Sequence, residues 1–124
     1  PLTEENHNMI NKDSIAKMKK GVILLNTSRG KLINAKDLVD CLEKGMIGGV
    51  GLDVFEDEEE YFLNDMSNSY IRDAELSILL SMPNVVITAH QAFFTKEALE
   101  KIVSTTLSNI KEYIETGKCE NIVE

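Results

Sequence analysis

The sequence predicts an α/β fold, in which a parallel sheet of about three strands with helical crossovers is followed by a long C-terminal helix. Three short apolar segments carry the first part of this prediction, at residues 22–26, 50–55 and 84–89, because continuous apolar runs of this length are typical of buried strands. Stretches with helical periodicity lie between them. Such an alternation favours parallel strands joined by helices.

The first half of the chain contains two predicted helices with recognisable ends. A short turn capped by Thr3 precedes a helix at 13–19, and Gly21 ends that helix. Asn34 caps a second helix at 35–44, since asparagine is a favoured N-cap residue. Its apolar face and its terminating glycine are formed by Leu38, Val39, Cys41, Leu42 and Gly45.

The second half is predicted to hold a long loop and two helices. Residues 56–72 are polar and acidic without a clear period, and loops of that length are more often functional than accidental. A helix at 73–81 follows and stops at Pro83. Thr95 caps a helix at 96–116, which Gly117 ends. Its apolar stripe comprises Leu99, Ile102, Val103, Thr106, Leu107, Ile110, Tyr113 and Ile114.

Composition limits the classes of partner and compartment. The 124 residues suffice for one domain, and 21 acidic against 13 basic residues give a formal charge of −8, which disfavours nucleic acid and anionic membranes. The two cysteines are far apart, so we expect reduced thiols and a cytoplasmic location. No apolar run suggests a membrane span or a signal peptide. The chain does not begin with methionine, and we expect it to be a piece of a longer protein.

Three groups with chemical potential fall at or just beyond the predicted strand ends: Arg29, the acidic run at 56–60 after Asp53, and His90. Parallel strands bring their carboxyl ends to one edge of a sheet, where ligands bind in open α/β folds. An anion-binding guanidinium, a general acid or base and an orienting carboxylate would form a unit there. Taken singly, each has a structural alternative: a surface arginine, a solvated acidic face and a hydrogen-bonded loop histidine. Metal and serine-nucleophile motifs are not found.

Five ordered motifs give the chain a family resemblance: PLT at 1–3, MKKG at 18–21, NTSRG at 26–30, GGVGLDVFE at 48–56 and HQAFFT at 90–95. Together they resemble the C-terminal part of D-2-hydroxyacid dehydrogenases, and within that family the fermentative D-lactate dehydrogenases. The resemblance implies a partial Rossmann-like sheet, NAD as cofactor, and interconversion of pyruvate and D-lactate. It covers nearly the whole chain.

The resemblance also implies a catalytic set of Arg29, Glu58 and His90. Arg29 matches the arginine that holds the substrate carboxylate and polarises the carbonyl, Glu58 the glutamate that orients the histidine, and His90 the proton donor. Imidazole changes its charge close to neutral pH, and a nearby carboxylate favours the protonated form. His90 held by Glu58 could therefore deliver a proton in one direction and accept it in the other.

For the cofactor, the resemblance implies that the nicotinamide half of NAD is lined by Pro1, Asn6, Thr27, Ser28, Arg29 and Asp53, with Asp53 expected to bind the carboxamide. The glycine-rich phosphate loop GxGxxG does not occur in the sequence. We therefore expect residues 1–124 to be the C-terminal half of the NAD-binding domain, with a helix at about 96–116 that returns to a substrate domain outside the chain. We expect no activity from these residues alone.

Two functions from different classes remain. The first is a fragment of an NAD-dependent D-lactate dehydrogenase, and the alternative is a non-catalytic binding or assembly module of the same fold. Other 2-oxo acids, including glyoxylate, hydroxypyruvate, 2-oxoisocaproate and phenylpyruvate, would use the same three groups. Phe93 and Phe94 could form part of a pocket wall or pack in a core. A homo-oligomer of the longer chain stays open.

Overall fold

The computed structural model describes residues 1–56, 58 and 70–123. These residues divide into two compact units, 1–91 and 92–124, and each is described by itself. Most of the predicted loop at 56–72 lies outside the described residues. In the part of the chain that is described, no helix combines the length and the apolar character needed to cross a bilayer.

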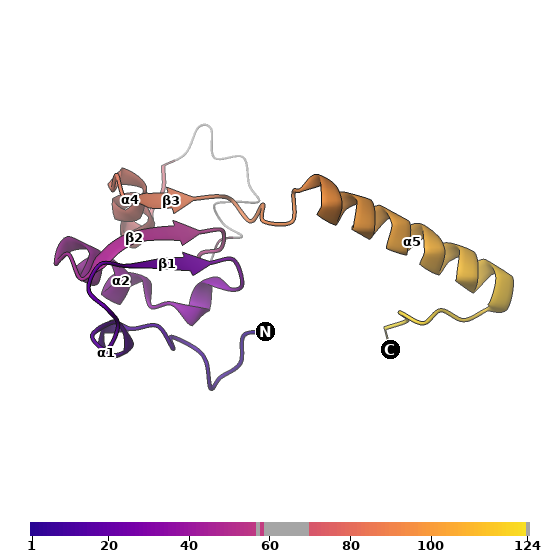
Figure 1. The fold of residues 1–124 in the computed structure, drawn as a ribbon, viewed down its shortest axis with the longest axis horizontal. Helices are drawn as coiled ribbons and strands as arrows, with labels where there is room; N and C mark the ends of the chain where they lie inside the picture. The colour runs from indigo at the N-terminus through magenta and orange to yellow at the C-terminus, as the bar shows by residue number, and fades with distance from the viewer. Residues whose placement is uncertain (57, 59–69, 124) are drawn as a thin grey trace. The chain divides into compact units, whose positions relative to one another are not determined.

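The first unit is built on a sheet of three parallel strands, β1 (Val22–Asn26), β2 (Ile47–Leu52) and β3 (Val85–Ile87), in the order β1-β2-β3. All three arrows in Figure 1 point the same way. The predicted parallel sheet is confirmed, and β1 has the predicted bounds. However, β2 begins and ends three residues earlier than predicted. The apolar Val54 and Phe55 are buried after the strand has ended, so apolarity extends beyond the hydrogen-bonded ladder.

Short helices precede and connect the strands of this unit. α1 (Lys12–Ile15) is shorter than predicted and begins with a capping box, in which Asn11 accepts from the Ser14 amide. η1 (Gly30–Leu32) is the next element after β1, and α2 (Ala35–Glu43) begins at its predicted cap, where the Asn34 side chain accepts from the Asp37 amide. α4 (Ala74–Ser81) follows its cap Asp73.

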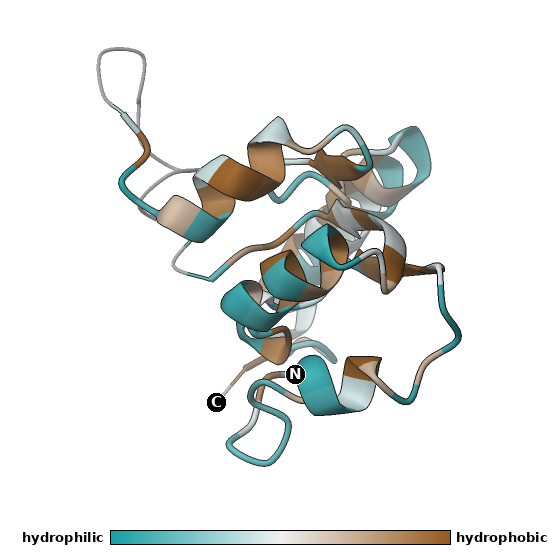
Figure 2. Cartoon of the chain, turned by 90° about the vertical axis from the view of Figure 1, so that its left-hand side faces the viewer, coloured by the Kyte–Doolittle hydropathy of each residue, from teal (hydrophilic) through white to brown (hydrophobic). Residues whose placement is uncertain are grey.

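One face of the sheet is covered and carries the hydrophobic core of the unit. α2 packs against β2 and α4, and α4 packs against β3. α2 carries its buried residues Leu38, Val39, Cys41 and Leu42 on one face, as an amphipathic helix on a sheet requires, whereas α4 is apolar along most of its length (Figure 2). The opposite face of the sheet is exposed at Ile23, Leu25 and Val86. The buried apolar residues include Leu38, Leu42, Ile47, Val50, Leu52, Leu76 and Leu79.

The second unit consists of α5 (Lys96–Thr116) and short flanking segments. The helix begins and ends as predicted: the Thr95 hydroxyl accepts from the Ala98 amide, and Gly117 adopts a left-handed conformation with φ +70°. None of its 21 residues is buried. Phe93 and Phe94 form an edge-to-face pair, and both are exposed, so they are not part of the core of the first unit.

Candidate active site

The carboxyl ends of the three strands lie side by side at one edge of the sheet. Asn26 pairs with Leu52, and Leu52 pairs with Ile87, so the chain leaves all three strands at the same level. Arg29 and His90 each lie three residues beyond a strand, and Asp53 follows β2 directly. The predicted convergence of these segments on one edge is therefore present. In open α/β folds this edge is where ligands bind.

The loop that carries Arg29 is held from its inner side by Asn26, which is buried with 6% of its surface exposed. The Asn26 side chain accepts a hydrogen bond from the Ser28 amide at 3.1 Å and donates one to the Arg29 carbonyl at 2.9 Å. Arg29 itself is exposed, and its Nη1 donates to the Ser28 carbonyl at 2.7 Å. Among the described residues no carboxylate pairs with the Arg29 guanidinium. This arrangement suits the binding of a carboxylate from solution.

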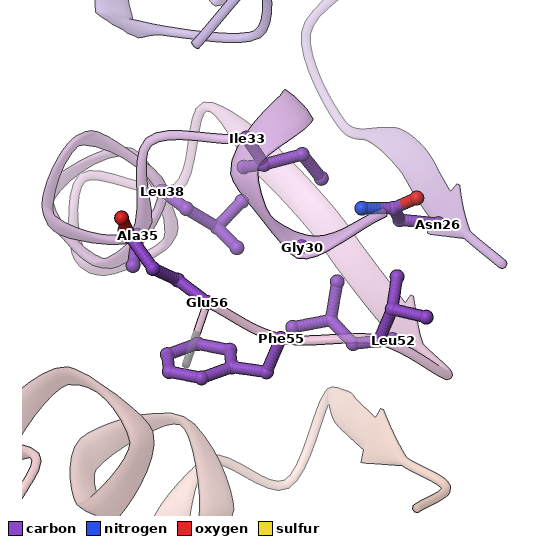
Figure 3. Close-up of a pocket in the computed structure, with 9 residues that line it drawn as sticks. Asn26, Gly30, Ile33, Ala35, Leu38, Leu52, Phe55 and Glu56 are labelled. Atoms are coloured by element: carbon purple, nitrogen blue, oxygen red, sulfur yellow. The ribbon is translucent and has the colours of Figure 1, made fainter. Parts of the chain in front are cut away.

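At Gly30 the Arg29 loop packs closely against the segment that follows β2. A Cβ atom at Gly30 would overlap the Phe55 backbone carbonyl and the Glu56 amide nitrogen. Figure 3 shows Gly30 between Asn26 and Phe55 in a small pocket, which Ile33 and Leu38 also line. The space for water-sized occupants there is about 10 Å³, enough for one water at most. This pocket lies where the two backbone segments pack against each other, and it is too small to hold a substrate.

Asp53 is buried, with 4% of its surface exposed, and connects β2 to both neighbouring segments. Its amide donates to the Asn26 carbonyl at 2.9 Å, and its own carbonyl accepts from the His90 amide at 2.8 Å. Its carboxylate oxygen Oδ1 accepts from the Thr88 hydroxyl at 2.5 Å and from the Gln91 amide at 2.8 Å. Asp53 therefore fixes the backbone on both sides of His90.

His90 and Glu58 form a close pair of titratable side chains at this edge. His90 Nδ1 lies 2.7 Å from Glu58 Oε1, and Glu58 Oε2 accepts from the Phe55 amide at 2.9 Å. Because an ionised carboxylate can only accept, Nδ1 carries the proton of this contact and Nε2 is the nitrogen left to exchange a proton. The His90 side chain is 47% exposed. Such a pair can act as a general acid or base with a fixed ring orientation.

His90 adopts a left-handed backbone conformation, with φ +50°. Residues other than glycine rarely occupy this region, although histidine does so more often than most. Conformations of this kind cost about 1–3 kcal/mol and persist where surrounding contacts impose them. The hydrogen bonds that the His90 and Gln91 amides donate to Asp53 and the contact with Glu58 are such contacts.

The N-terminal segment lies beside the Arg29 loop. The Asn8 amide donates to the Lys31 carbonyl at 2.8 Å, which places the segment next to η1. Asn6 closes the first turn, because its side chain donates to the Pro1 carbonyl at 2.9 Å and accepts from the Thr3 amide at 2.8 Å. In Figure 1 the N-terminus lies on the side to which the strand arrows point. The N-terminus is thus on the same side of the first unit as the strand ends.

The residues expected to line the nicotinamide half of NAD carry polar groups of the kind that bind a carboxamide. Thr27 and Ser28 are exposed on the loop after β1, and the Asp53 carboxylate at the adjacent strand end is buried and accepts from Thr88 and Gln91. Hydroxyl, carboxylate and backbone groups at such an edge can bind a carboxamide. The fit does not extend to the pyrophosphate, because the sequence contains no GxGxxG loop.

The sequence-based prediction missed three residues of this edge, namely Asn26, Thr88 and Gln91. Asn26 is a polar residue at the end of an apolar strand, and such a residue is a usable signal. Thr88 and Gln91 carried no such signal, since their contacts with Asp53 depend on the pairing of β2 with β3. No group of three or more metal-binding side chains is present within residues 1–56, 58 and 70–123.

Comparison with known proteins identifies the family. Residues 1–92 match the family model for the D-isomer specific 2-hydroxyacid dehydrogenase NAD-binding domain. The chain is 46% identical over 121 residues to 2-hydroxyacid dehydrogenase A of Aspergillus oryzae, covering 98% of the chain and 35% of that protein. It is also 46% identical to an aromatic 2-oxoacid reductase of Clostridium sporogenes, covering 98% of the chain and 37% of that protein.

Among solved structures, the chain is similar to the D-lactate dehydrogenase of Lactobacillus jensenii with NAD⁺, with a TM-score of 0.90 and 33% identity. The match covers the whole of this chain and 37% of the enzyme's chain. The chain thus spans just over a third of the length of these relatives. Because the family model covers the sheet and every residue of the edge described above, this chain belongs to the D-isomer specific 2-hydroxyacid dehydrogenase family, through its NAD-binding domain.

Proposed function

We propose that these residues are part of an NAD-dependent D-lactate dehydrogenase that interconverts pyruvate and D-lactate, with His90 as the proton donor. The observation that supports this most is the 2.7 Å contact between His90 Nδ1 and Glu58 Oε1 at the edge of the sheet where ligands bind. Reduction of a ketone to an alcohol needs a proton at the carbonyl oxygen, and an imidazole held by a carboxylate can supply it.

In the proposed mechanism each of three side chains has one task. The Arg29 guanidinium binds the substrate carboxylate through its fork of donors and draws electron density from the carbonyl. Glu58 holds Nδ1 of His90, so that Nε2 gives its proton to the carbonyl oxygen during reduction and takes the hydroxyl proton during oxidation. NAD, when bound, supplies or accepts the hydride. Its nicotinamide half would be held by Pro1, Asn6, Thr27, Ser28, Arg29 and Asp53.

The proposal places residues 1–124 in the C-terminal half of an NAD-binding domain, with the helix at 96–116 returning to a substrate domain. The chain covers just over a third of its relatives, and α5 buries none of its residues; both observations support a longer protein. A cytoplasmic location belongs to the same proposal and is supported by Cys41 and Cys119, which are both free thiols.

The proposal is tested by NADH oxidation with pyruvate in the complete protein that carries these residues. His90→Ala should lower kcat by about 10²–10⁴-fold, the usual contribution of a general acid. His7→Ala is the matched control, because His7 is the other histidine of the chain and lies exposed in the N-terminal turn. Turnover by His90→Ala equal to that of the His7 variant would refute the assignment.

Substrate choice is tested with the same protein. One relative is named an aromatic 2-oxoacid reductase and one neighbour a D-lactate dehydrogenase, so pyruvate and phenylpyruvate are the informative pair. A higher kcat/KM for pyruvate would support the lactate assignment, and a higher value for phenylpyruvate would replace it with aromatic 2-oxo acid reduction.

The alternative function is a non-catalytic binding or assembly module of the same fold. The uncovered apolar stripe of α5 is the observation that favours it. This alternative predicts that the 124 residues alone form a stable complex, which sedimentation would detect. A monomeric chain whose complete parent turns over pyruvate would exclude it.

A further inference from the structure

We propose that Asn26 is a positioning residue for Arg29: it braces the peptide on which the guanidinium rests and thereby sets the carboxylate-binding geometry. This inference rests on the proposed function and deepens it. Asn26 is not among the residues that the family resemblance assigns to catalysis or cofactor binding. The Asn26 side chain contacts neither the Arg29 guanidinium nor the His90 ring, so its effect must pass through the backbone of the Arg29 loop.

The contacts of Asn26 enclose the peptide of Ser28 from both sides. Its Oδ1 accepts from the Ser28 amide at 3.1 Å, and its Nδ2 donates to the Arg29 carbonyl at 2.9 Å. The Ser28 carbonyl between these two points accepts from Arg29 Nη1 at 2.7 Å. The Arg29 guanidinium therefore donates to a backbone segment, from the Ser28 amide to the Arg29 carbonyl, whose two ends are hydrogen-bonded to the Asn26 side chain.

The remaining surroundings make this brace decisive. Arg29 is exposed and, within the described residues, pairs with no carboxylate, so its side-chain direction depends on its own backbone. Asn26 is 6% exposed, and its carbonyl accepts from the Asp53 amide at 2.9 Å. Because Asp53 in turn accepts from the His90 amide at 2.8 Å, Asn26 also ties the arginine loop to the histidine segment through the backbone. A buried amide with both ends in use holds a single orientation.

The role predicts a specific kinetic signature. Loss of the donor to the Arg29 carbonyl should loosen the guanidinium and weaken carboxylate binding, whereas the Glu58–His90 contact involves neither atom of the Asn26 side chain. The KM for the 2-oxo acid should therefore rise while the pH profile of kcat stays unchanged. A general collapse of the edge would alter both.

The test compares Asn26→Ser with Asn84→Ser in the complete protein. Asn84 is a matched control because its Nδ2 also donates to a backbone carbonyl of the sheet, that of Gly48 at 3.1 Å, but before β3 rather than at a carboxyl end. We expect Asn26→Ser to raise the KM for pyruvate by about tenfold, the effect of one lost hydrogen bond, and Asn84→Ser to leave it unchanged. Asn26→Leu removes both contacts and should raise the KM further.

Hydrogen exchange in the 124-residue chain gives a second, activity-independent readout. Exchange of the Ser28 amide should accelerate by about tenfold in Asn26→Leu, which removes its side-chain acceptor, and stay unchanged in Asn84→Ser. Unchanged exchange, faster exchange with an unchanged KM, or a KM rise accompanied by a shifted pH profile would each overturn the proposal. A wild-type protein that turns over no 2-oxo acid would instead contradict the proposed function, and with it the positioning role that rests on it.

Discussion

Helices α2 and α5 have the same local signals but different burial. Asn34 and Thr95 cap them with side chains that accept from the third amide of each helix, at 2.9 Å and 3.2 Å. Gly45 and Gly117 follow them with φ of +65° and +70°. Yet α2 buries four of its nine residues and α5 none of its 21. The most exposed apolar residue of α5, Ile114, is 77% exposed.

The difference shows which information is local. Capping residues and glycines determine where a helix begins and ends, because they act on the backbone groups of its first and last turns. Burial of the apolar stripe needs a partner surface, which β2 and α4 supply to α2. The first unit therefore contains a hydrophobic core, whereas the apolar stripe of α5 is not buried by any described residue.

The largest expected effect is the loss of unfolding free energy when a leucine is truncated in α2, compared with the same change in α5. Leu38→Ala removes a fully buried side chain of α2 and should lower the free energy of unfolding by about 3–4 kcal/mol. Leu107→Ala, the same change at a 63% exposed position of α5, should cost about 0.5 kcal/mol or less. Urea unfolding of the 124-residue chain, followed by circular dichroism, measures both. Equal losses would mean that α5 is packed as tightly as α2.

The next effect tests the close packing at Gly30. Gly30→Ala would place a methyl group on the Phe55 backbone and should cost about 2–3 kcal/mol through forced displacement. Gly45→Ala is the control, since its Cβ would meet nothing within 4 Å and only its φ of +65° is unfavourable, at about 1 kcal/mol. The same unfolding assay applies. If Gly30→Ala proved the milder change, the close approach of these two segments would be disproved.

A smaller effect compares the two caps. Asn34→Ala and Thr95→Ala each remove one side-chain acceptor at a helix start, worth about 1 kcal/mol. In α2 the loss should appear as a lower midpoint of cooperative unfolding. In α5 it should appear as reduced helicity, because the helix has no core to unfold with. Hydrogen exchange of the first-turn amides separates the two responses, and a cooperative loss from Thr95→Ala would contradict the comparison.

The smallest effect concerns the Cys41 thiol in α2. Burial raises the pKa of Cys41 above its ordinary value of 9.0, although nearby Lys44 lowers it somewhat. A raised pKa means that the unfolded thiol ionises first, so the contribution of Cys41 to stability is full below pH 9.0 and is lost as pH rises through the folded pKa. Urea unfolding on either side of this range should show a loss that Cys41→Ala reduces. An identical pH dependence in both proteins would contradict it.

The sequence was sufficient for those features that depend on neighbours along the chain. Both bounds of β1, the caps Asn34 and Thr95 and the end of α5 at Gly117 follow from residue type and spacing. It was insufficient where partners come from elsewhere: β2 ends at Leu52 because Asp53 turns to bond Thr88 and the His90 segment. The left-handed backbone of His90 has the same origin.

For the candidate site, the sequence predicts Arg29, Glu58 and His90 but not the groups that contact them. Glu58 was chosen within an acidic run by family resemblance, and its 2.7 Å contact with His90 depends on the packing of segments that are 32 residues apart. The brace of Asn26 is local, within three residues of Arg29. A polar residue at the end of an apolar strand is therefore a signal that sequence reasoning can use.

A double-mutant cycle on pyruvate reduction in the complete protein shows whether Glu58 and His90 act as one acid–base unit. The kcat values of Glu58→Gln, His90→Ala and the double variant are compared with that of the wild type. If Glu58 acts through His90, the double variant should be no slower than His90→Ala alone, because residues that act as a unit are non-additive. Losses that multiply would show two independent roles and contradict the account.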